Sequence, residues 1–327
     1  MGKKIKYFEA LRGIAIIMVI AIHTYPHSDS SFNIFIRQIL NCAVPIFFAL
    51  SGYFLYKKSL ETKEQIYSFW RKQIPKVYFP VLIWSLPWFI PEMIHGKLIQ
   101  APLRLFSCGY SIYYFVAVII QFYLLLPLLQ RCRVGNSSMG GAISCSISIV
   151  SIIFITYIHI ILGTKLPLIV YAGSCLLWLW FFIIGCKLSQ SDRQYGMMVP
   201  IVVSIIGLIA SFFEGSYLIE NYAGGAGIKP TSFVFSAGMC YLSLSTSMEK
   251  LYDSINCKIS NVIEYLGKNS FALYLLHIHV VKYTHSVQDI THSWTLYFLV
   301  VLILSILLIE IIKNLIPSKF QYYLGIY

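Results

Sequence analysis

The chain has 327 residues, a length that two ordinary soluble domains could fill. Its composition excludes this, because only 12% of the residues are charged and 58% are hydrophobic, with a mean hydropathy of +0.73. Soluble domains carry about 25% charged residues, and so few charges could not cover so much apolar surface in water. The net charge of +12 fits basic loops beside a membrane better than a nucleic-acid-binding face. We therefore expect a lipid bilayer as a partner and no nucleic acid.

Apolar runs long enough to cross a bilayer, about 20 residues each, recur along the chain. We predict ten spans, at residues 8–26, 32–56, 74–95, 110–130, 141–163, 168–187, 196–213, 231–248, 262–283 and 294–316. The predicted fold is all-α: a polytopic membrane helical bundle of about ten transmembrane helices. Residues 1–327 are expected to form this single transmembrane domain, without an appended soluble domain.

Basic residues are distributed unevenly between the two sides of this ten-span arrangement. With the N-terminus inside, 18 of the 25 Lys and Arg residues fall on the inner side, six on the outer side, and Arg12 within the first span. The six outer residues are Arg37, Lys97, Arg104, Lys165, Lys229 and Lys282. The positive-inside rule then predicts that both termini are inside.

The first span carries the ionisable residues Glu9, Arg12 and His23. A charged side chain inside a span costs free energy, so its presence indicates a function. Glu9 and Arg12 are three residues apart and can pair, while Arg12 and His23 share one helix face about 16 Å apart. Gly13 would let a neighbouring helix approach closely. The alternatives are that Arg12 snorkels at the inner interface and that His23 lies among outer headgroups without a task.

The second span contains a proline and a small polar pair, and a basic segment follows it. Pro45 and Ser51-Gly52 predict a bent helix beside a cavity. The segment from Trp70 to Lys76 contains Arg71, Lys72 and Lys76, cations suited to phosphates. Ordinary positive-inside charge or lipid headgroup contact would explain these cations equally well.

The ninth span ends with two histidines, His277 and His279. Two residues apart on a helix, they face different sides and do not form a bidentate metal site. The eight cysteines are scattered without a CxxC pair, so we predict no metal site and no disulfide framework.

Together these segments resemble the acyltransferase 3 family of integral membrane acyltransferases. The specific match is Arg12-x10-His23 within Glu-Ala-Leu-Arg-Gly-Ile-Ala, followed by Val-Pro-Ile-Phe-Phe-Ala-Leu-Ser-Gly-Tyr and the basic segment. The segments Tyr113–Pro127 and Gly267–His277 continue the pattern. The likeness is greatest to short bacterial members, which O-acetylate envelope polysaccharides or their precursors.

The resemblance implies an acetyl-CoA or other acyl-CoA donor, a sugar hydroxyl as carbohydrate acceptor, no bound cofactor, and a place in the bacterial plasma (inner) membrane. His23 and Arg12 fall on the family's essential histidine and arginine, and Glu9 replaces the more usual Asp. Arg71 matches the first position of the family's RxxR-like motif, whose second position is not cleanly present. Tyr114 stands where Trp is frequent and would provide an aromatic wall.

The expected chemistry also follows from the residue types. Acyl transfer from a thioester to a hydroxyl needs a base and donors for the developing oxyanion. His23 would be the base, and Ser51, Tyr274 or backbone amides could be the donors. Arg71, Lys72 and Lys76 would hold the donor's phosphates, while His277 would point inward to the site. A membrane transporter of a small polar or anionic substrate, such as an amino acid, is the alternative function.

Overall fold

The computed structural model describes residues 2–25, 30–222, 224, 227–291 and 293–327, and it is helical without any strand in these ranges. The helices are α1 (Gly2–Thr24), α2 (Ser31–Leu40), α3 (Ala43–Leu55), α4 (Lys63–Ile94), α5 (Gln100–Phe106), α6 (Tyr114–Arg131), α7 (Ser138–Thr156), α8 (Leu168–Ala172), α9 (Cys175–Ser189), α10 (Met198–Tyr222), α11 (Pro230–Leu244), α12 (Thr246–Tyr252), α13 (Cys257–Lys268), α14 (Ser270–Thr291), α15 (Trp294–Leu315) and α16 (Ser318–Gln321). Short 3₁₀ turns lie at Ser111–Tyr113, Val134–Asn136 and Tyr322–Leu324, and a π-helical turn at Tyr157–Ile161.

The predicted apolar runs coincide with helices, although the end of the first run, residue 26, lies outside the described residues. Within the described ranges, seven helical segments are long and apolar enough to cross a membrane, and α9 is a shorter apolar helix. The seven are Lys6–Thr24, Ser31–Leu55, Lys63–Ile94, Ser111–Arg131, Ser138–Ile161, Met198–Tyr222 and Trp294–Leu315. The helical membrane character is thus confirmed, while the count of ten and the orientation stay predictions.

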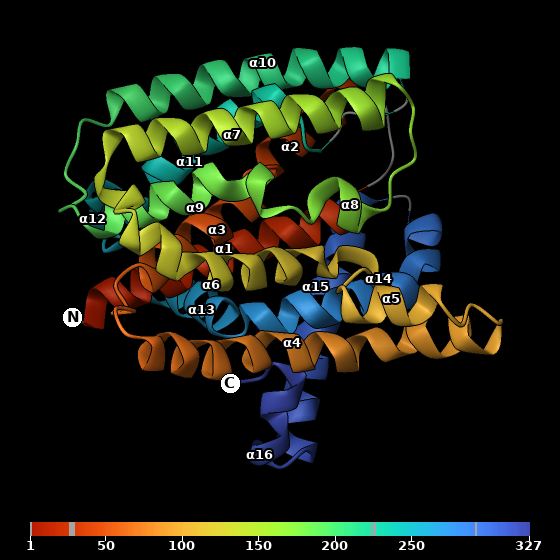
Figure 1. The fold of residues 1–327 in the computed structure, drawn as a ribbon. Helices are drawn as coiled ribbons and strands as arrows, with labels where there is room; N and C mark the ends of the chain where they lie inside the picture. Colours follow the sequence, from red (N-terminus) through yellow and green to blue (C-terminus); the bar gives the residue numbers. More distant parts are fainter. Residues whose placement is uncertain (1, 26–29, 223, 225–226, 292) are drawn as a thin grey trace.

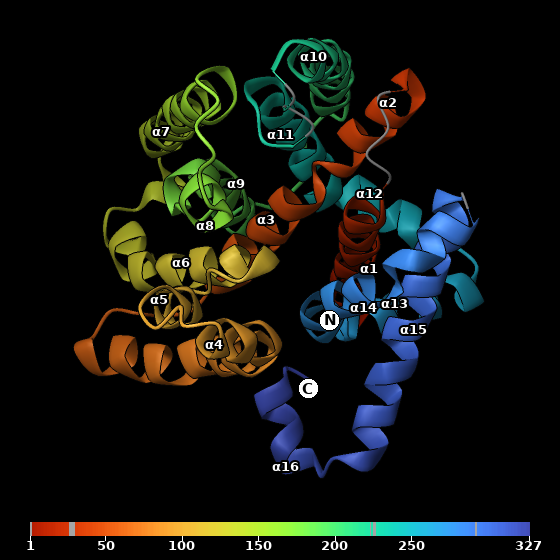
Figure 2. The same ribbon diagram turned by 90° about the vertical axis from the view of Figure 1, so that its right-hand side faces the viewer.

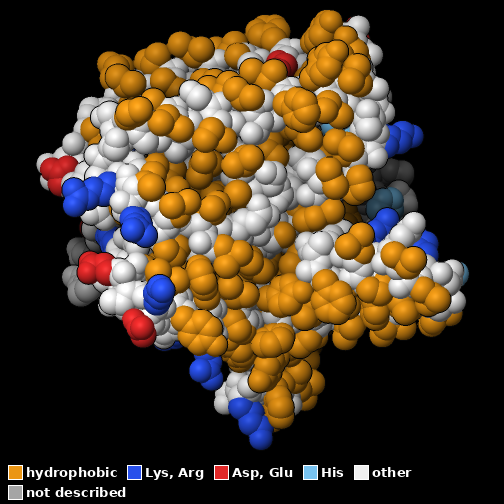
Figure 3. Space-filling model, in the orientation of Figure 1, with side chains coloured by type: hydrophobic (Ala, Val, Ile, Leu, Met, Phe, Trp, Pro, Cys, Tyr) orange, Lys and Arg blue, Asp and Glu red, His pale blue; other side chains and the backbone are white. Residues whose placement is uncertain are grey.

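The long helices run roughly alongside one another, with polar chain segments at the two ends of the bundle. Figure 1 shows the N-terminus and α12 at one end, and α5 and α8 at the other. In Figure 3 orange side chains dominate the space between these ends, and charged groups gather mainly at the edge beside the N-terminus. An apolar belt of this kind suits contact with hydrocarbon rather than water.

Helix α1 is central to the packing. It contacts α3, α13, α14 and α15, and Figure 2 shows it between α3 and the α13–α15 group. A Cβ added to Gly13 would lie 2.1 Å from the Ile263 carbonyl oxygen, and one on Gly267 would lie 1.7 Å from the Glu9 carbonyl oxygen. The two glycines therefore let the backbones of α1 and α13 touch, as small residues do between membrane helices. The close approach predicted at Gly13 is confirmed.

A second glycine contact fixes α3 against α9. A Cβ on Gly52 would lie 2.0 Å from the Phe182 carbonyl oxygen, and one on Gly185 would lie 1.8 Å from the Ala49 carbonyl oxygen. Replacing either glycine would force these helices apart. The pair holds α3, and with it the neighbouring cavities, at a fixed distance from α9.

The predicted bend in the second span is present as a break between α2 and α3. The break lies at Asn41 and Cys42, and Pro45 follows in the first turn of α3, where its missing N–H costs no helical hydrogen bond. By contrast, α4 continues through Pro75, Pro80, Pro87 and Pro91. Helix α4 also begins earlier than predicted, at Lys63, which is 11 residues before residue 74. Its start is fixed by a capping box that Thr62 and Gln65 form.

Candidate functional site

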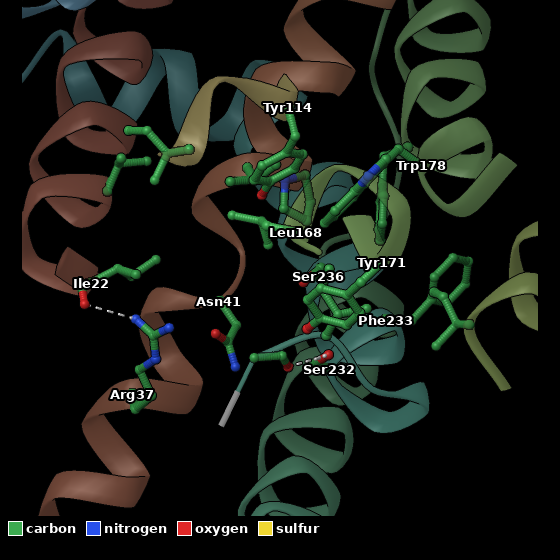
Figure 4. A pocket seen from close by; sticks show the side chains of 18 of the residues that line it. Ile22, Arg37, Asn41, Tyr114, Leu168, Tyr171, Trp178, Ser232, Phe233 and Ser236 are labelled. Atoms are coloured by element: carbon green, nitrogen blue, oxygen red, sulfur yellow. Dashed lines mark hydrogen bonds between the residues drawn. The ribbon is translucent and has the colours of Figure 1, made fainter. Parts of the chain in front are cut away.

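Two cavities meet at His23, near the end of α1. The first, which we call the Lys76 cavity, encloses about 510 Å³ between α1, α3, α4, α6 and the α13–α14 junction. The second, the Arg37 cavity, encloses about 280 Å³ and is bounded by α2, α8, α9 and α11 (Figure 4). Both cavities are lined by Val19, His23, Val44, Ile112 and Tyr114.

The Lys76 cavity follows the polar face of α1 from Glu9 to His23, about 21 Å at 1.5 Å per residue. Arg12 lies between these two residues on the cavity wall, as the sequence predicts. The cavity is also lined by Lys76 and Lys268, so three cations and one carboxylate surround it. Such a lining attracts an anionic ligand toward the end that carries the chain's N-terminus.

The charged groups of the Lys76 cavity have defined neighbours. Glu9 pairs with Lys268 at 3.8 Å, and the Arg12 guanidinium lies over the Phe54 ring, 4.9 Å from its centroid. Lys76 Nζ lies 4.2 Å from the centroid of the Tyr327 ring. Tyr327 donates a hydrogen bond to the Lys76 carbonyl oxygen. Burial raises the pKa of Tyr327, so its hydroxyl stays protonated at neutral pH.

The remaining predicted cations are only partly gathered here. Arg71 and Lys72 are exposed on α4 and do not line the cavity. Lys72 precedes Lys76 by one helical turn, so its side chain leaves α4 on the same face. Arg71 and Lys72 are thus available only to the part of a ligand that extends outside the cavity.

The predicted oxyanion donors Ser51 and Tyr274 both line the Lys76 cavity, but their hydroxyl hydrogens are engaged. Ser51 Oγ donates to the Phe47 carbonyl oxygen at 2.9 Å, and the Tyr274 hydroxyl donates to the Ile112 carbonyl oxygen at 2.5 Å. Either hydroxyl would have to leave its carbonyl before it could stabilise an oxyanion.

His277 lies behind His23, although 254 residues separate them in the sequence. It is fully buried, and its Nε2 is 3.2 Å from His23 Nδ1. His277 Nδ1 is 2.8 Å from the Leu273 carbonyl oxygen, and His23 Nδ1 is 2.8 Å from the Val19 carbonyl oxygen.

These contacts determine where the ring protons belong. A carbonyl oxygen only accepts hydrogen bonds, so the Nδ1 atom of each histidine carries the proton. In the neutral pair the single His23 Nδ1–H group is shared between two acceptors, the Val19 carbonyl oxygen and His277 Nε2, and His23 Nε2 keeps a lone pair. His23 thus has the tautomer that a general base requires, held by the Val19 carbonyl oxygen and by His277.

His279 faces a different group of residues, as its spacing from His277 predicts. Its Nε2 lies 3.1 Å from the Tyr113 hydroxyl oxygen, and its ring packs 4.2 Å from that of Trp88. The two histidines do not converge, and the described residues contain no cluster of His, Cys, Asp and Glu suited to a metal ion.

The Arg37 cavity was not predicted from the sequence. Figure 4 shows Arg37 on one side of it, and Tyr171 and Trp178 on the other. The charge distribution counts Arg37 with the outer side, but Arg37 also falls inside the predicted span 32–56, just as Arg12 falls inside the first span. A cation within a span is the signal that could have identified it.

Comparisons with known proteins place the chain in a family through one family model. No solved structure matches the chain. A serine/alanine racemase from Enterococcus gallinarum is 24% identical over 339 residues, which cover 93% of this chain and 45% of the racemase. The chain thus spans less than half the length of that relative. The acyltransferase 3 family model, described as an acyltransferase domain, matches residues 5–312. With nearly its whole length matched, the chain belongs to the acyltransferase 3 family.

Proposed function

We propose that this chain is a membrane O-acyltransferase that moves an acetyl group from cytoplasmic acetyl-CoA to a hydroxyl of a sugar. The acceptor is a polysaccharide of the cell envelope or its lipid-linked precursor, and the chain resides in a bacterial plasma membrane. The observation that carries the proposal is the position of His23 where the Lys76 and Arg37 cavities meet. Two substrates that enter from opposite ends of the bundle can meet at one base.

The Lys76 cavity is the proposed donor site. Its net positive lining suits the polyanionic CoA, whose thioester arm would extend along the α1 face past Arg12 to His23. The phosphates lie nearer the cytoplasmic end, where Lys76 lines the cavity and Arg71 and Lys72 are exposed outside it. Arg12 thus contacts the donor's arm between the phosphates and the reacting carbonyl.

In the proposed reaction His23 Nε2 takes the proton from the acceptor hydroxyl, while the oxygen of that hydroxyl forms a bond to the thioester carbonyl carbon. The C–S bond then breaks, the acyl group stays on the acceptor oxygen, and the CoA sulfur leaves with the proton that His23 held. During the step the His23 ring is cationic, and His277 Nε2 accepts a hydrogen bond from its Nδ1–H group. His277 is therefore a positioning residue that acts through His23.

The test compares O-acyl groups on the surface glycans of host cells that carry the wild-type chain, a deletion, His23→Ala or His95→Ala. His95 is an exposed histidine outside both cavities, so it controls for loss of a histidine alone. At equal membrane abundance we expect the acyl signal to be absent in the deletion and in His23→Ala, and retained in His95→Ala. An unchanged signal in the deletion would refute the function. A signal that the deletion loses but His23→Ala retains would refute the role of His23 as base.

Transport of a small polar substrate is the second candidate, since two cavities that approach from opposite ends also suit a transport path. The relative is a serine/alanine racemase, so serine and alanine are the substrates to assay. Uptake of either amino acid into vesicles that contain the purified chain but no acyl-CoA would favour transport. Activity that depends strictly on acyl-CoA favours the transferase.

A further inference from the structure

Resting on the proposed function, we infer that the Arg37 cavity selects an acceptor that carries a negative charge, a carboxylate or a phosphate, close to the hydroxyl that is acylated. The chemical class is thus an acidic sugar or a phosphorylated one, rather than a neutral glycan. Arg37 and His23 line the same small cavity, together with aromatic and polar side chains.

Arg37 has no carboxylate partner in the part of the chain that the structure describes. Its guanidinium donates one hydrogen bond, to the Ile22 carbonyl oxygen at 3.1 Å, as Figure 4 shows. An Arg side chain has five N–H donors, so the described residues satisfy only a small part of its capacity. Among the residues that the structure describes, no Asp or Glu forms an ion pair with Arg37 or lines the cavity. Arg37 is half-buried on the cavity wall, and a cation in such a place is stabilised by an anionic ligand.

The rest of the lining suits a sugar ring. Tyr114, Tyr171 and Trp178 supply aromatic surface, and Asn41 and Ser236 supply polar groups. Figure 4 shows the aromatic side chains across the cavity from Arg37, so a ring packed on them would direct a substituent toward the guanidinium. At about 280 Å³ the cavity lies near the lower limit of about 300 Å³ for small-molecule sites, which restricts it to one sugar unit.

The position of His23 links charge recognition to the reaction. His23 lines this cavity together with Arg37, so an acceptor whose hydroxyl reaches His23 Nε2 keeps its anionic group inside the same space. A bidentate contact of a carboxylate or phosphate with Arg37 would then fix the orientation of the ring. Arg37 is, in this proposal, the residue that determines acceptor specificity.

The first test measures kcat/KM with acetyl-CoA and three matched acceptors: a methyl glucuronide, the corresponding methyl glucoside, and glucose 6-phosphate. For the full chain in lipid nanodiscs, we expect an acidic acceptor to exceed the glucoside by about 10- to 100-fold, the factor typical of a charge-assisted hydrogen bond. The better of the two acidic acceptors identifies carboxylate or phosphate as the recognised group.

Variants of Arg37 assign the preference to this residue. We expect Arg37→Gln to lower the ratio of acidic to neutral acceptor to about 1, and Arg37→Lys to retain part of it. Lys165→Gln removes an exposed cation that lines neither cavity, and should keep the wild-type ratio. A wild-type ratio near 1, or a ratio that Arg37→Gln leaves unchanged, would overturn the inference.

The second test maps the acyl group on the glycans of the host by mass spectrometry, comparing cells with and without the chain. A chain-dependent acyl group on a sugar that bears a carboxylate or phosphate supports the inference. The same group on a neutral sugar overturns it and leaves the proposed transferase function standing. If no acyl group depends on the chain, the proposed function fails, and the acceptor inference fails with it.

Discussion

The contact between His23 and His277 predicts a measurable effect that is confined to turnover. His277→Leu would remove the acceptor that faces His23 Nδ1 at 3.2 Å, while the bond from His23 Nδ1 to the Val19 carbonyl oxygen would remain. His277→Gln can restore an acceptor oxygen at a similar distance from the backbone. The variants thus separate the hydrogen bond from the mere presence of a side chain.

The magnitude follows from the change in charge on His23 during the reaction. A hydrogen bond to a charged group is worth about 1.5–3 kcal/mol, and one between neutral groups about 0.5–1.5 kcal/mol. Only the difference, about 1–1.5 kcal/mol, accelerates the reaction, because the neutral bond already exists in the ground state. At roughly 1.36 kcal/mol per factor of ten, kcat falls by about 5- to 13-fold in His277→Leu. Loss of the base itself in His23→Ala costs about 10²- to 10⁴-fold.

The assay is the release of CoA thiol with a saturating acceptor, at equal amounts of folded protein. We expect His277→Leu to lower kcat with little change in KM for acetyl-CoA, and His277→Gln to recover most of the loss. His279→Leu removes a histidine that lines neither cavity and serves as the control. Full activity in His277→Leu would refute the positioning role, whereas a loss as large as in His23→Ala would mean that His277 itself takes part in proton transfer.

Three further predictions concern the walls of the site. Lys76→Gln should raise KM for acetyl-CoA about tenfold. Arg71→Gln should raise KM less, and its effect should vanish above about 0.5 M salt because Arg71 is exposed. If the effects of both variants depended equally on salt, this assignment would be contradicted. Tyr114→Phe should keep the aromatic wall and most of the activity, and Tyr114→Ala should lower kcat/KM at least about tenfold. An equal loss of kcat/KM in both variants would show that activity requires the Tyr114 hydroxyl and not the ring alone. Gly267→Ala should lower the free energy of unfolding by about 1–3 kcal/mol, measured by thermal unfolding, because the added Cβ would clash with a backbone carbonyl on α1. Gly196→Ala is the control and should leave the stability unchanged, because its Cβ would have no atom within 4 Å.

The sequence predicts local features of this fold better than contacts between distant segments. The apolar runs identify the helices because each run must satisfy its backbone hydrogen bonds within itself in lipid. Gly13 and Gly52 likewise mark close helix contacts that the structure confirms. The start of α4 was missed because the basic residues around Arg71 lower the local hydropathy without ending the helix.

In the candidate site, too, the sequence predicts the local features but not the contacts between distant segments. The shared face of Arg12 and His23 follows from helical periodicity alone, and both residues line the Lys76 cavity. The contact between His23 and His277 depends on how α1 packs against α14, which no local pattern encodes. The Arg37 cavity is lined by residues of eight helices between α1 and α11, so only the position of Arg37 within a span pointed to it.

The meeting of the two cavities has a consequence for the electrical barrier of the membrane. In the proposed membrane orientation, the shared lining residues Val19, Val44 and Tyr114 would separate the two cavities, so much of the transmembrane voltage would fall across the region of His23. A potential of about 100 mV is worth about 2.3 kcal/mol for each elementary charge that crosses the whole field. In the proposed cycle His23 passes a proton from the acceptor on one side of this region to the CoA sulfur on the other, so acyl transfer should depend on membrane potential. A smaller residue at this position would thin the barrier further and let ions leak.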